Sequence, residues 1–226
     1  GQLSLAGPER RPDVTAQLAG VELARGGLGL KSVQLQARLP ALGEQAGHLQ
    51  LIADGMTTAN GRDWGRLSLE ADGLREDHAL QWRLEGEDLQ GSGRLGGALS
   101  AAGWSGEQQA GQLTVAGLDW RLVEPHALAW QQAEQRLWLA PHCWRSDAAS
   151  LCNEDEMRLG RSGHVRLSLA GLALERLRGV WPEGLPLAGQ ASGNAVGDWA
   201  AGDPPVLTAG IEARDGEMAE ILMRRH

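Results

Sequence analysis

The chain contains two cysteines, Cys143 and Cys152, with eight residues between them. Two short apolar runs, residues 137–144 and 149–152, flank a polar stretch at 145–147, which is typical of two strands joined by a turn. Residues directly opposed in an antiparallel pair have Cα atoms roughly 4.5 Å apart, a separation that a disulfide can span. We therefore expect a structural Cys143–Cys152 disulfide, which would contribute about 2–3 kcal/mol, and an oxidising compartment.

The same segment offers other chemistry, because His142 and the more distant His126 could join the two cysteines as metal ligands. Zinc is usually held by two close ligand pairs, and the adjacent His142 and Cys143 cannot both point at one ion from an extended strand. A pair of reduced, buried cysteines is the third interpretation. The disulfide is favoured, and we expect neither a metal site nor a cofactor.

The remaining motifs point away from catalysis. Residues 91–96 match G-x-G-x-x-G, but a polar stretch precedes them and a strand-like stretch follows, whereas a dinucleotide site needs a buried strand and then a helix. The acidic run at 154–156 lacks the spacing of a calcium-binding loop and is interpreted as a solvated turn. We therefore expect a protein that is not an enzyme. Four histidines lie on alternating strands without convergent partners: His48, His78, His126 and His164.

The composition restricts the class of partner. The net charge of −8 argues against nucleic acid and against an anionic membrane surface. Hydrophobic residues make up 42% of the 226 residues and often alternate with polar ones, which excludes low-complexity disorder. No apolar run approaches the ~18 residues that a membrane helix requires. Because the expected disulfide implies export, we expect the export signal to lie outside this segment, as part of a longer protein.

A short pattern recurs along the chain: Gly, a polar residue, alternating apolar and polar residues, then Gly. It is typical of half-buried strands bounded by turns, and its irregular spacing excludes a fixed-period solenoid. We expect roughly 14 to 17 strands, with short helical segments at 172–180 and 217–225. No linker interrupts them, so residues 1–226 are expected to form one continuous β segment. Copies of the pattern lie at residues 1–7, 47–55, 65–73, 111–117 and 163–171.

The expected fold class is all-β: an elongated, curved, taco-like sheet of mostly antiparallel or mixed strands around an apolar groove, with one or two short helices. Antiparallel strands with one apolar face usually close, and a closed β-sandwich is the alternative. The groove is favoured because the apolar face is nearly all Leu, Ala and Val, and the chain has nine Trp but no Phe or Tyr. A sandwich core of this size normally uses Phe and Tyr as well.

The cysteine segment also resembles a known family. Residues 118–123, 137–144 (Leu-Trp-Leu-Ala-Pro-His-Cys-Trp) and 151–152 (Leu-Cys) are similar to the periplasmic portion of the TamB family, within the AsmA-like superfamily. The likeness continues through 163–174 and 181–189. Set against the family's pattern, the segment is expected to lie between the N-terminal membrane anchor and the C-terminal domain that meets the outer-membrane barrel TamA. It is therefore expected to be an internal periplasmic fragment.

The resemblance implies a protein of the periplasm of a Gram-negative bacterium, anchored in the inner membrane in its full-length form. The family is linked to phospholipid transport and to outer-membrane biogenesis with TamA, including autotransporter assembly. The fold that the resemblance implies is an elongated groove, U-shaped or taco-like, which is apolar inside and polar outside. This agrees with the alternation of the strands.

We accordingly expect a bridge-like conduit segment that binds phospholipid acyl chains for transport between the inner and outer membranes. A Leu/Ala/Val wall buries apolar surface at ~25 cal/mol per Å² without directional contacts, so the cargo would be free to slide. The alternatives are a chaperone groove that receives unfolded outer-membrane protein strands, and a structural spacer with a closed, dry core. The expected groove-lining residues are Leu35, Leu49, Leu51, Leu67, Leu69, Leu80, Trp82, Leu84, Leu113, Val115, Leu137, Leu139, Leu167 and Leu169.

Overall fold

The computed structural model describes residues 2–6, 13–25, 28–40, 45–57, 63–115, 117–177, 188–202 and 204–214. These residues form antiparallel strands and one 3-10 turn, so the all-β prediction is confirmed. Within them, no helix is long and apolar enough to cross a membrane. The chain divides into two compact units: unit 1 is Gly1–Ala101 with Ser105–Val115, and unit 2 is Ala102–Trp104 with Ala116–His226.

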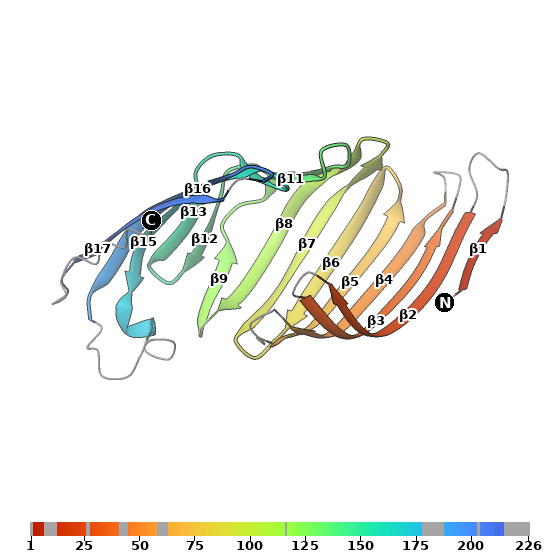
Figure 1. The fold of residues 1–226 in the computed structure, drawn as a ribbon, viewed down its shortest axis with the longest axis horizontal. Helices are drawn as coiled ribbons and strands as arrows, with labels where there is room; N and C mark the ends of the chain where they lie inside the picture. The colour runs from red at the N-terminus through yellow and green to blue at the C-terminus, as the bar shows by residue number, and fades with distance from the viewer. Residues whose placement is uncertain are drawn as a thin grey trace. The chain divides into compact units, whose positions relative to one another are not determined.

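Unit 1 is a meander in which each strand is hydrogen-bonded to the next in chain order (Figure 1). Arg25 is opposed to Leu28, as the hairpin predicted between residues 14–24 and 28–39 requires. The long strands follow from the alternation of apolar and polar residues, because each strand then presents one face of each kind. The strands are β1 (Gln2–Ala6), β2 (Asp13–Arg25), β3 (Leu28–Leu39), β4 (Gly47–Thr57), β5 (Asp63–Leu74), β6 (Asp77–Glu85), β7 (Leu89–Ser100) and β8 (Gly103–Val115).

Unit 2 contains several strands of three to six residues, and its strands do not all pair in chain order. β9 pairs with β12, and β10 pairs with β11. These four strands form a two-sided antiparallel ribbon, with β9 and β10 along one side and β11 and β12 along the other. β12 also pairs with β13, and β13 with β15. The strands are β9 (Leu118–Leu122), β10 (His126–Gln131), β11 (Arg136–Leu139), β12 (His142–Ser146), β13 (Ala149–Asn153), β14 (Met157–Leu159), β15 (Gly163–Ala173), β16 (Gln190–Trp199) and β17 (Val206–Arg214).

A bulge in β15 builds the small buried core of unit 2. The register with β16 shifts between Leu169 and Leu172, and Gly171 lies there with φ of +65°, a conformation that favours glycine. The shift brings Leu169 and Leu172 into the same apolar cluster. The buried members of this cluster are Leu118, Ala149, Leu172, Leu174 and Ala191, and Trp120 and Leu169 pack against them.

In the described part of the segment expected to be helical, residues 172–177, the structure has the 3-10 turn η1 (Leu174–Leu177). The β15 strand continues to Ala173, and the backbone N–H of Leu174 donates to the Gly189 carbonyl at 2.9 Å. The Gly189 N–H donates in turn to the carboxylate of Glu175 at 3.0 Å. Residues 178–187 and the helix expected at 217–225 lie outside the described residues.

Candidate functional site

One face of unit 1 is apolar from strand to strand. Cross-strand partners share a face of a sheet, and the register joins Leu with Leu: Leu35 opposes Leu51, and Leu51 opposes Leu69. The apolar surface therefore runs continuously across β3 to β6. Three rows make it up: Leu35, Leu51, Leu69 and Trp82; Ala37, Leu49, Ala71 and Leu80; and Val33, Ala53, Leu67 and Leu84.

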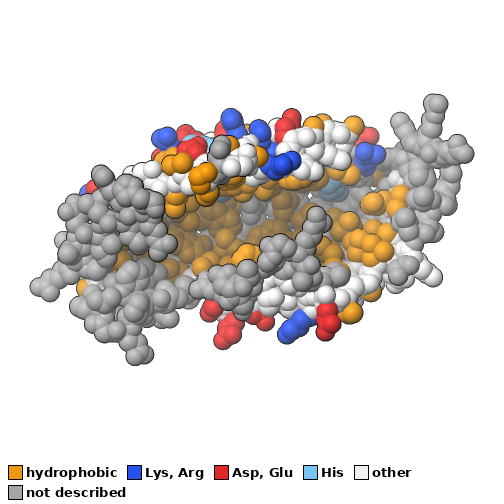
Figure 2. Space-filling view, in the orientation of Figure 1, with side chains coloured by type: hydrophobic (Ala, Val, Ile, Leu, Met, Phe, Trp, Pro, Cys, Tyr) orange, Lys and Arg blue, Asp and Glu red, His pale blue; other side chains and the backbone are white. Residues whose placement is uncertain are grey.

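The large side chains of this face are half-buried. Among the described residues of unit 1, the buried hydrophobic side chains are small, Ala37 and Ala53, and no large side chain in the described chain is fully buried. In Figure 2, hydrophobic side chains gather in the recessed area of the view, and charged side chains lie along its margins. The described part of unit 1 thus lacks the dry interior that the closed-sandwich alternative requires.

The ring of Trp82 covers two glycines of β7. A β-carbon at Gly91 would lie 3.0 Å from the ring, and one at Gly93 would collide with the indole nitrogen of Trp82. An aromatic ring over a cross-strand glycine shields backbone that has no side chain of its own. The G-x-G-x-x-G motif therefore lies inside a strand, as predicted, and two of its glycines make room for Trp82.

The residues expected to line a groove differ in where the structure places them. In unit 1, eight of them lie in the three apolar rows, and Leu113 lies close by, since a β-carbon at Gly91 would touch its Cδ2 at 2.6 Å. Val115 is 41% exposed. In unit 2, Leu137, Leu139 and Leu167 are half-buried, whereas Leu169 packs against the buried cluster and belongs to the core.

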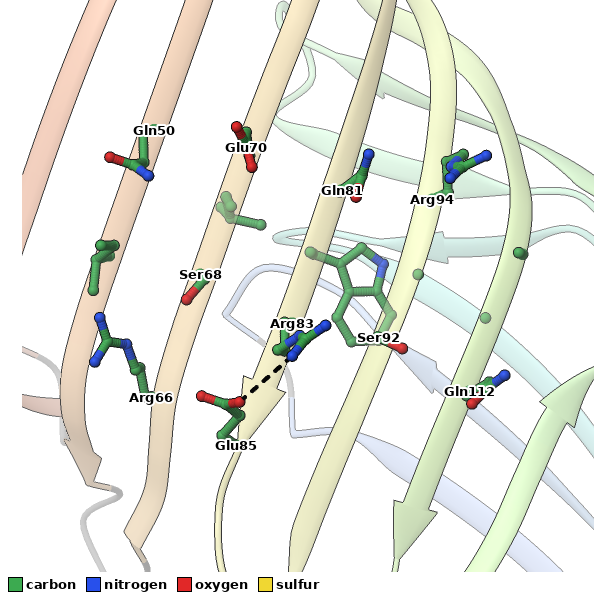
Figure 3. Close-up of a pocket in the computed structure, with 16 residues that line it drawn as sticks. Gln50, Arg66, Ser68, Glu70, Gln81, Arg83, Glu85, Ser92, Arg94 and Gln112 are labelled. Atoms are coloured by element: carbon green, nitrogen blue, oxygen red, sulfur yellow. Dashed lines mark ion pairs between the residues drawn. The ribbon is translucent and has the colours of Figure 1, made fainter.

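The opposite face of unit 1 is polar and carries a shallow hollow of about 750 Å³ (Figure 3). One cross-strand row there runs from Gln50 through Glu70 and Gln81 to Arg94. Alternation predicted a polar face, but no local pattern in the sequence indicates the hollow. Its labelled lining residues are Gln50, Arg66, Ser68, Glu70, Gln81, Arg83, Glu85, Ser92, Arg94 and Gln112.

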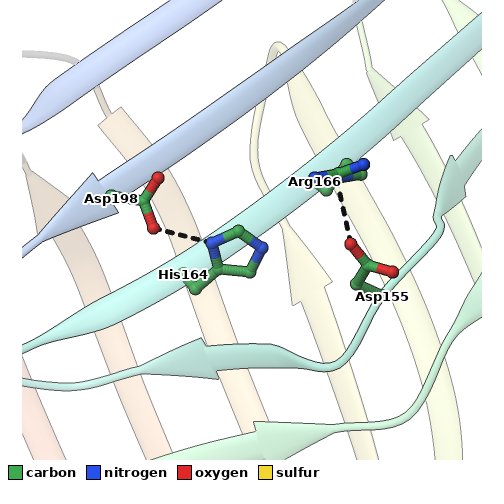
Figure 4. Close-up of polar contacts among 4 residues, drawn as sticks. All are labelled: Asp155, His164, Arg166 and Asp198. Carbon is green, nitrogen blue, oxygen red and sulfur yellow. Dashed lines mark hydrogen bonds and ion pairs between the residues drawn. The ribbon is translucent and has the colours of Figure 1, made fainter.

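Two histidines on polar faces have acidic partners, so the expectation that they lack convergent partners is wrong. His48 Nδ1 lies 2.7 Å from Asp72 in unit 1, and His164 Nδ1 lies 2.7 Å from Asp198 in unit 2 (Figure 4). Each pair is directly opposed across two strands. Near His48, Glu70 completes the one group of metal-type ligands whose donor atoms lie within 4.8 Å of one another among the described residues.

The acidic run at 154–156 is an exposed connection between β13 and β14, as predicted. Asp155 pairs with Arg166 at 2.9 Å (Figure 4), and Glu156 pairs with Arg158 at 3.1 Å. Hydrogen bonds from Arg158 and then Trp138 lower the pKa of Glu156. The run therefore serves to pair with neighbouring basic side chains on the surface.

The cysteine segment forms the hairpin β12–β13, and Cys143 and Cys152 are directly opposed and joined by a disulfide. Their Cα atoms are 4.0 Å apart. The predicted bridge is confirmed, and it leaves no free thiolate that could join His142 in binding a metal ion. Because neighbouring residues alternate, Cys143 lies on one face of the hairpin and His142 on the other.

His142 stacks on His126, with ring centroids 3.8 Å apart and an angle of 6° between the planes. His126 is 5% exposed, and neither of its ring nitrogens has a hydrogen-bond partner. Burial, and next the nearby His142, lower the pKa of His126 to about 4. Asn153, opposed to His142 on β13, is also buried with both side-chain polar atoms unpaired. The residue types suggested only a possible metal site at His126 and His142, and neither the stacking of the two rings nor the burial of Asn153 has a signal in the sequence.

These features define an all-β protein whose antiparallel strands separate an open apolar face from a polar one. The chain belongs to the TamB family: the profile described as "TamB, N-terminal domain" matches residues 1–223. No solved structure matches the chain.

Proposed function

We propose that this chain is a wall segment of a conduit for phospholipid acyl chains between the inner and outer membranes. The observation that carries the proposal is the set of three apolar rows across β3 to β6, whose large side chains are half-buried and not sealed in a core. Family membership supports it, as does the agreement of the fold with the expected sheet.

The energetics of such a face suit a lipid chain. Each buried CH₂ gains ~0.8 kcal/mol, and Leu and Ala side chains impose no hydrogen-bond geometry, so an acyl chain is held without being fixed in place. The polar groups of the lipid would remain in water at the margins. Neighbouring strands repeat the same apolar face. An acyl chain would therefore meet similar side chains as it moves from one strand to the next.

The proposed setting is the periplasm of a Gram-negative bacterium, with the full-length protein anchored in the inner membrane and working with TamA at the outer membrane. The Cys143–Cys152 disulfide is consistent with an oxidising compartment. A non-enzymatic role is supported by the family. In this proposal residues 1–226 form one continuous groove-bearing segment of a longer protein.

The test is lipid co-purification from protein expressed in the periplasm, followed by native mass spectrometry and lipid extraction. Leu69→Glu places a charge in the apolar rows, and Ser68→Glu places the same charge on the adjacent residue of the polar face. Phospholipid should accompany the wild type and Ser68→Glu, and should fall at least about tenfold with Leu69→Glu. Circular dichroism checks that each variant keeps its strands.

Two outcomes would remove the lipid proposal. One is a wild-type protein that carries no phospholipid, and the other is equal retention by both variants. Introducing Glu at Leu167 provides the corresponding test in unit 2. Unfolding by Leu69→Glu would instead indicate a closed core, which is the spacer alternative.

A second candidate function is capture of unfolded outer-membrane protein strands. It is favoured by β17, in which all nine residues are exposed and Leu207 and Ile211 are 71% and 72% exposed. Strand capture relies on backbone hydrogen bonds, so it should survive Leu69→Glu. Cross-linking of an amphipathic outer-membrane strand peptide to β17, unchanged by that substitution and without bound lipid, would favour this function.

A further inference from the structure

The ribbon of unit 2 has a bend at which its hydrogen-bond ladder is interrupted. On one side of the bend Leu122 opposes Trp144, and on the other Leu128 opposes Leu139. From Leu122 to Leu128 the chain advances six residues, but from Trp144 back to Leu139 it advances only five. The side formed by β9 and β10 therefore carries one residue more than the side formed by β11 and β12. The register cannot be continuous between β9 and β10.

One backbone hydrogen bond between the two sides of the ribbon lies on each side of this interruption. The N–H of Val123 donates to the Cys143 carbonyl at 2.9 Å, and the N–H of Ala140 donates to the Ala127 carbonyl at 2.9 Å. Between them lies Pro141, which has no N–H to donate. Few backbone hydrogen bonds therefore join the two sides of the ribbon at the bend. Side-chain contacts must hold the two sides together there.

The stacked rings of His126 and His142 lie at this bend and bridge its two sides. The Nδ1 atom of His142 lies 2.8 Å from the Ala140 carbonyl, and since a carbonyl only accepts, Nδ1 carries the proton. His126 is 5% exposed and its two nitrogens are unpaired, which is costly for a polar ring and far more costly for a charged one. The stack is stable only while both rings are neutral.

The geometry does not suit a shared metal ion. A metal bound by an imidazole nitrogen lies close to the plane of that ring, whereas these two planes are almost parallel and 3.8 Å apart. One ion cannot lie in both planes. The chemistry left to the pair is uptake of a proton.

Among the described residues of unit 2, no acidic side chain is hydrogen-bonded to His126. On the face toward it, β12 contributes His142 and β13 contributes the uncharged Asn153, both on the apolar side of the sheet. Glu124, in the connection before β10, is exposed. The basic residues of the neighbouring strands alternate to the opposite face: Arg121 of β9, Arg136 of β11 and Arg145 of β12.

We propose that the His126–His142 stack is an acid-sensitive latch, which holds the bend of the ribbon closed while both rings are neutral and releases it when His126 is protonated. A charged His126 has no partner in the closed form and repels a charged His142, so it must turn toward water. The bend then opens because few backbone hydrogen bonds oppose it. The inference concerns the ribbon itself and does not depend on the cargo of the protein.

Hydrogen exchange followed by mass spectrometry tests the latch on the intact disulfide-bonded chain at pH 7.5 and pH 5.0, with rates corrected for the intrinsic pH dependence. The closed form binds the proton with a pKa of about 4, and an opened, hydrated His126 with its ordinary value of 6.5. The opening equilibrium of peptides covering residues 122–131 and 138–146 should therefore rise on the order of 30-fold between the two pH values.

The matched variants are His126→Phe, which keeps an aromatic ring in the stack but cannot be protonated, and His164→Gln, which removes a histidine elsewhere in unit 2. The rise should shrink to less than about twofold in the first variant and persist in the second. Equal opening of the wild type at both pH values, or an unchanged rise in His126→Phe, would refute the latch. If His126→Phe does not fold, the wild type decides by where exchange rises at pH 5.0: a rise confined to the peptides covering residues 122–131 and 138–146 supports the latch, and an equal rise in peptides covering β15 and β16 refutes it.

Discussion

Trp82 on β6 and Gly93 on β7 are directly opposed, and the indole ring occupies the space that a β-carbon at position 93 would need. Such a β-carbon would also lie 2.9 Å from the Ala110 carbonyl oxygen, which is backbone and cannot give way easily. The fit of ring to glycine therefore fixes how β6, β7 and β8 approach one another in unit 1.

Gly93→Ala is expected to lower the free energy of unfolding by about 1–3 kcal/mol, because Trp82 must move and the strands must separate slightly. Urea unfolding monitored by Trp fluorescence measures the change. Gly96→Ala is the matched control, since its β-carbon would meet only the end of the flexible Gln109 side chain. Its effect should stay within about 0.5 kcal/mol, and equal losses in both variants would contradict the argument.

The strands of this chain were predictable because their signals are local. Apolar and polar residues alternate within each strand, so the two faces of β5 and β6 can be assigned without knowing what pairs with them. The cysteine pair was predictable for the same reason, since a turn at 145–147 brings Cys143 and Cys152 together over nine residues of sequence.

What the sequence did not reveal depends on register between distant segments. His48 and Asp72 are 24 residues apart and His164 and Asp198 are 34 apart, so their pairing emerges only once the strands are aligned. The stack of His126 on His142 depends on how the two sides of the ribbon align across the one-residue slip, and the burial of Leu172 depends on the bulge at Gly171. Period-2 patterns carry no information on either irregularity.

Removing the disulfide with the double substitution Cys143→Ala/Cys152→Ala should lower the free energy of unfolding by about 2–3 kcal/mol, as expected for a loop of about ten residues. Urea unfolding under non-reducing conditions measures it. A reducing agent should destabilise the wild type by a similar amount and leave the double variant unchanged. A wild type insensitive to reduction would show that the hairpin is held by its strand pairing alone.

The buried His126 should make the chain less stable in acid. Its pKa is about 4 when folded and 6.5 when unfolded, so between these values the unfolded chain binds more protons and stability falls as the pH falls. The contribution is fully present above about pH 6.5, and about 3 kcal/mol of it is lost by pH 4. Urea unfolding at several pH values should show this slope, and His126→Leu should remove it. A slope that persists in His126→Leu would assign the acid sensitivity to other groups.

Asn153 is expected to reduce stability at neutral pH. It is 3% exposed, and neither Nδ2 nor Oδ1 has a hydrogen-bond partner, although it lies opposite Leu167 on the apolar face of the sheet. Asn153→Val replaces the unpaired amide with an apolar side chain that suits a strand, so the free energy of unfolding should rise by about 1–3 kcal/mol. Asn194→Val, an exposed position opposite Ser168, should change it by less than about 0.5 kcal/mol. A loss of stability in Asn153→Val would mean that the amide is paired with an ordered water molecule, which the valine would displace.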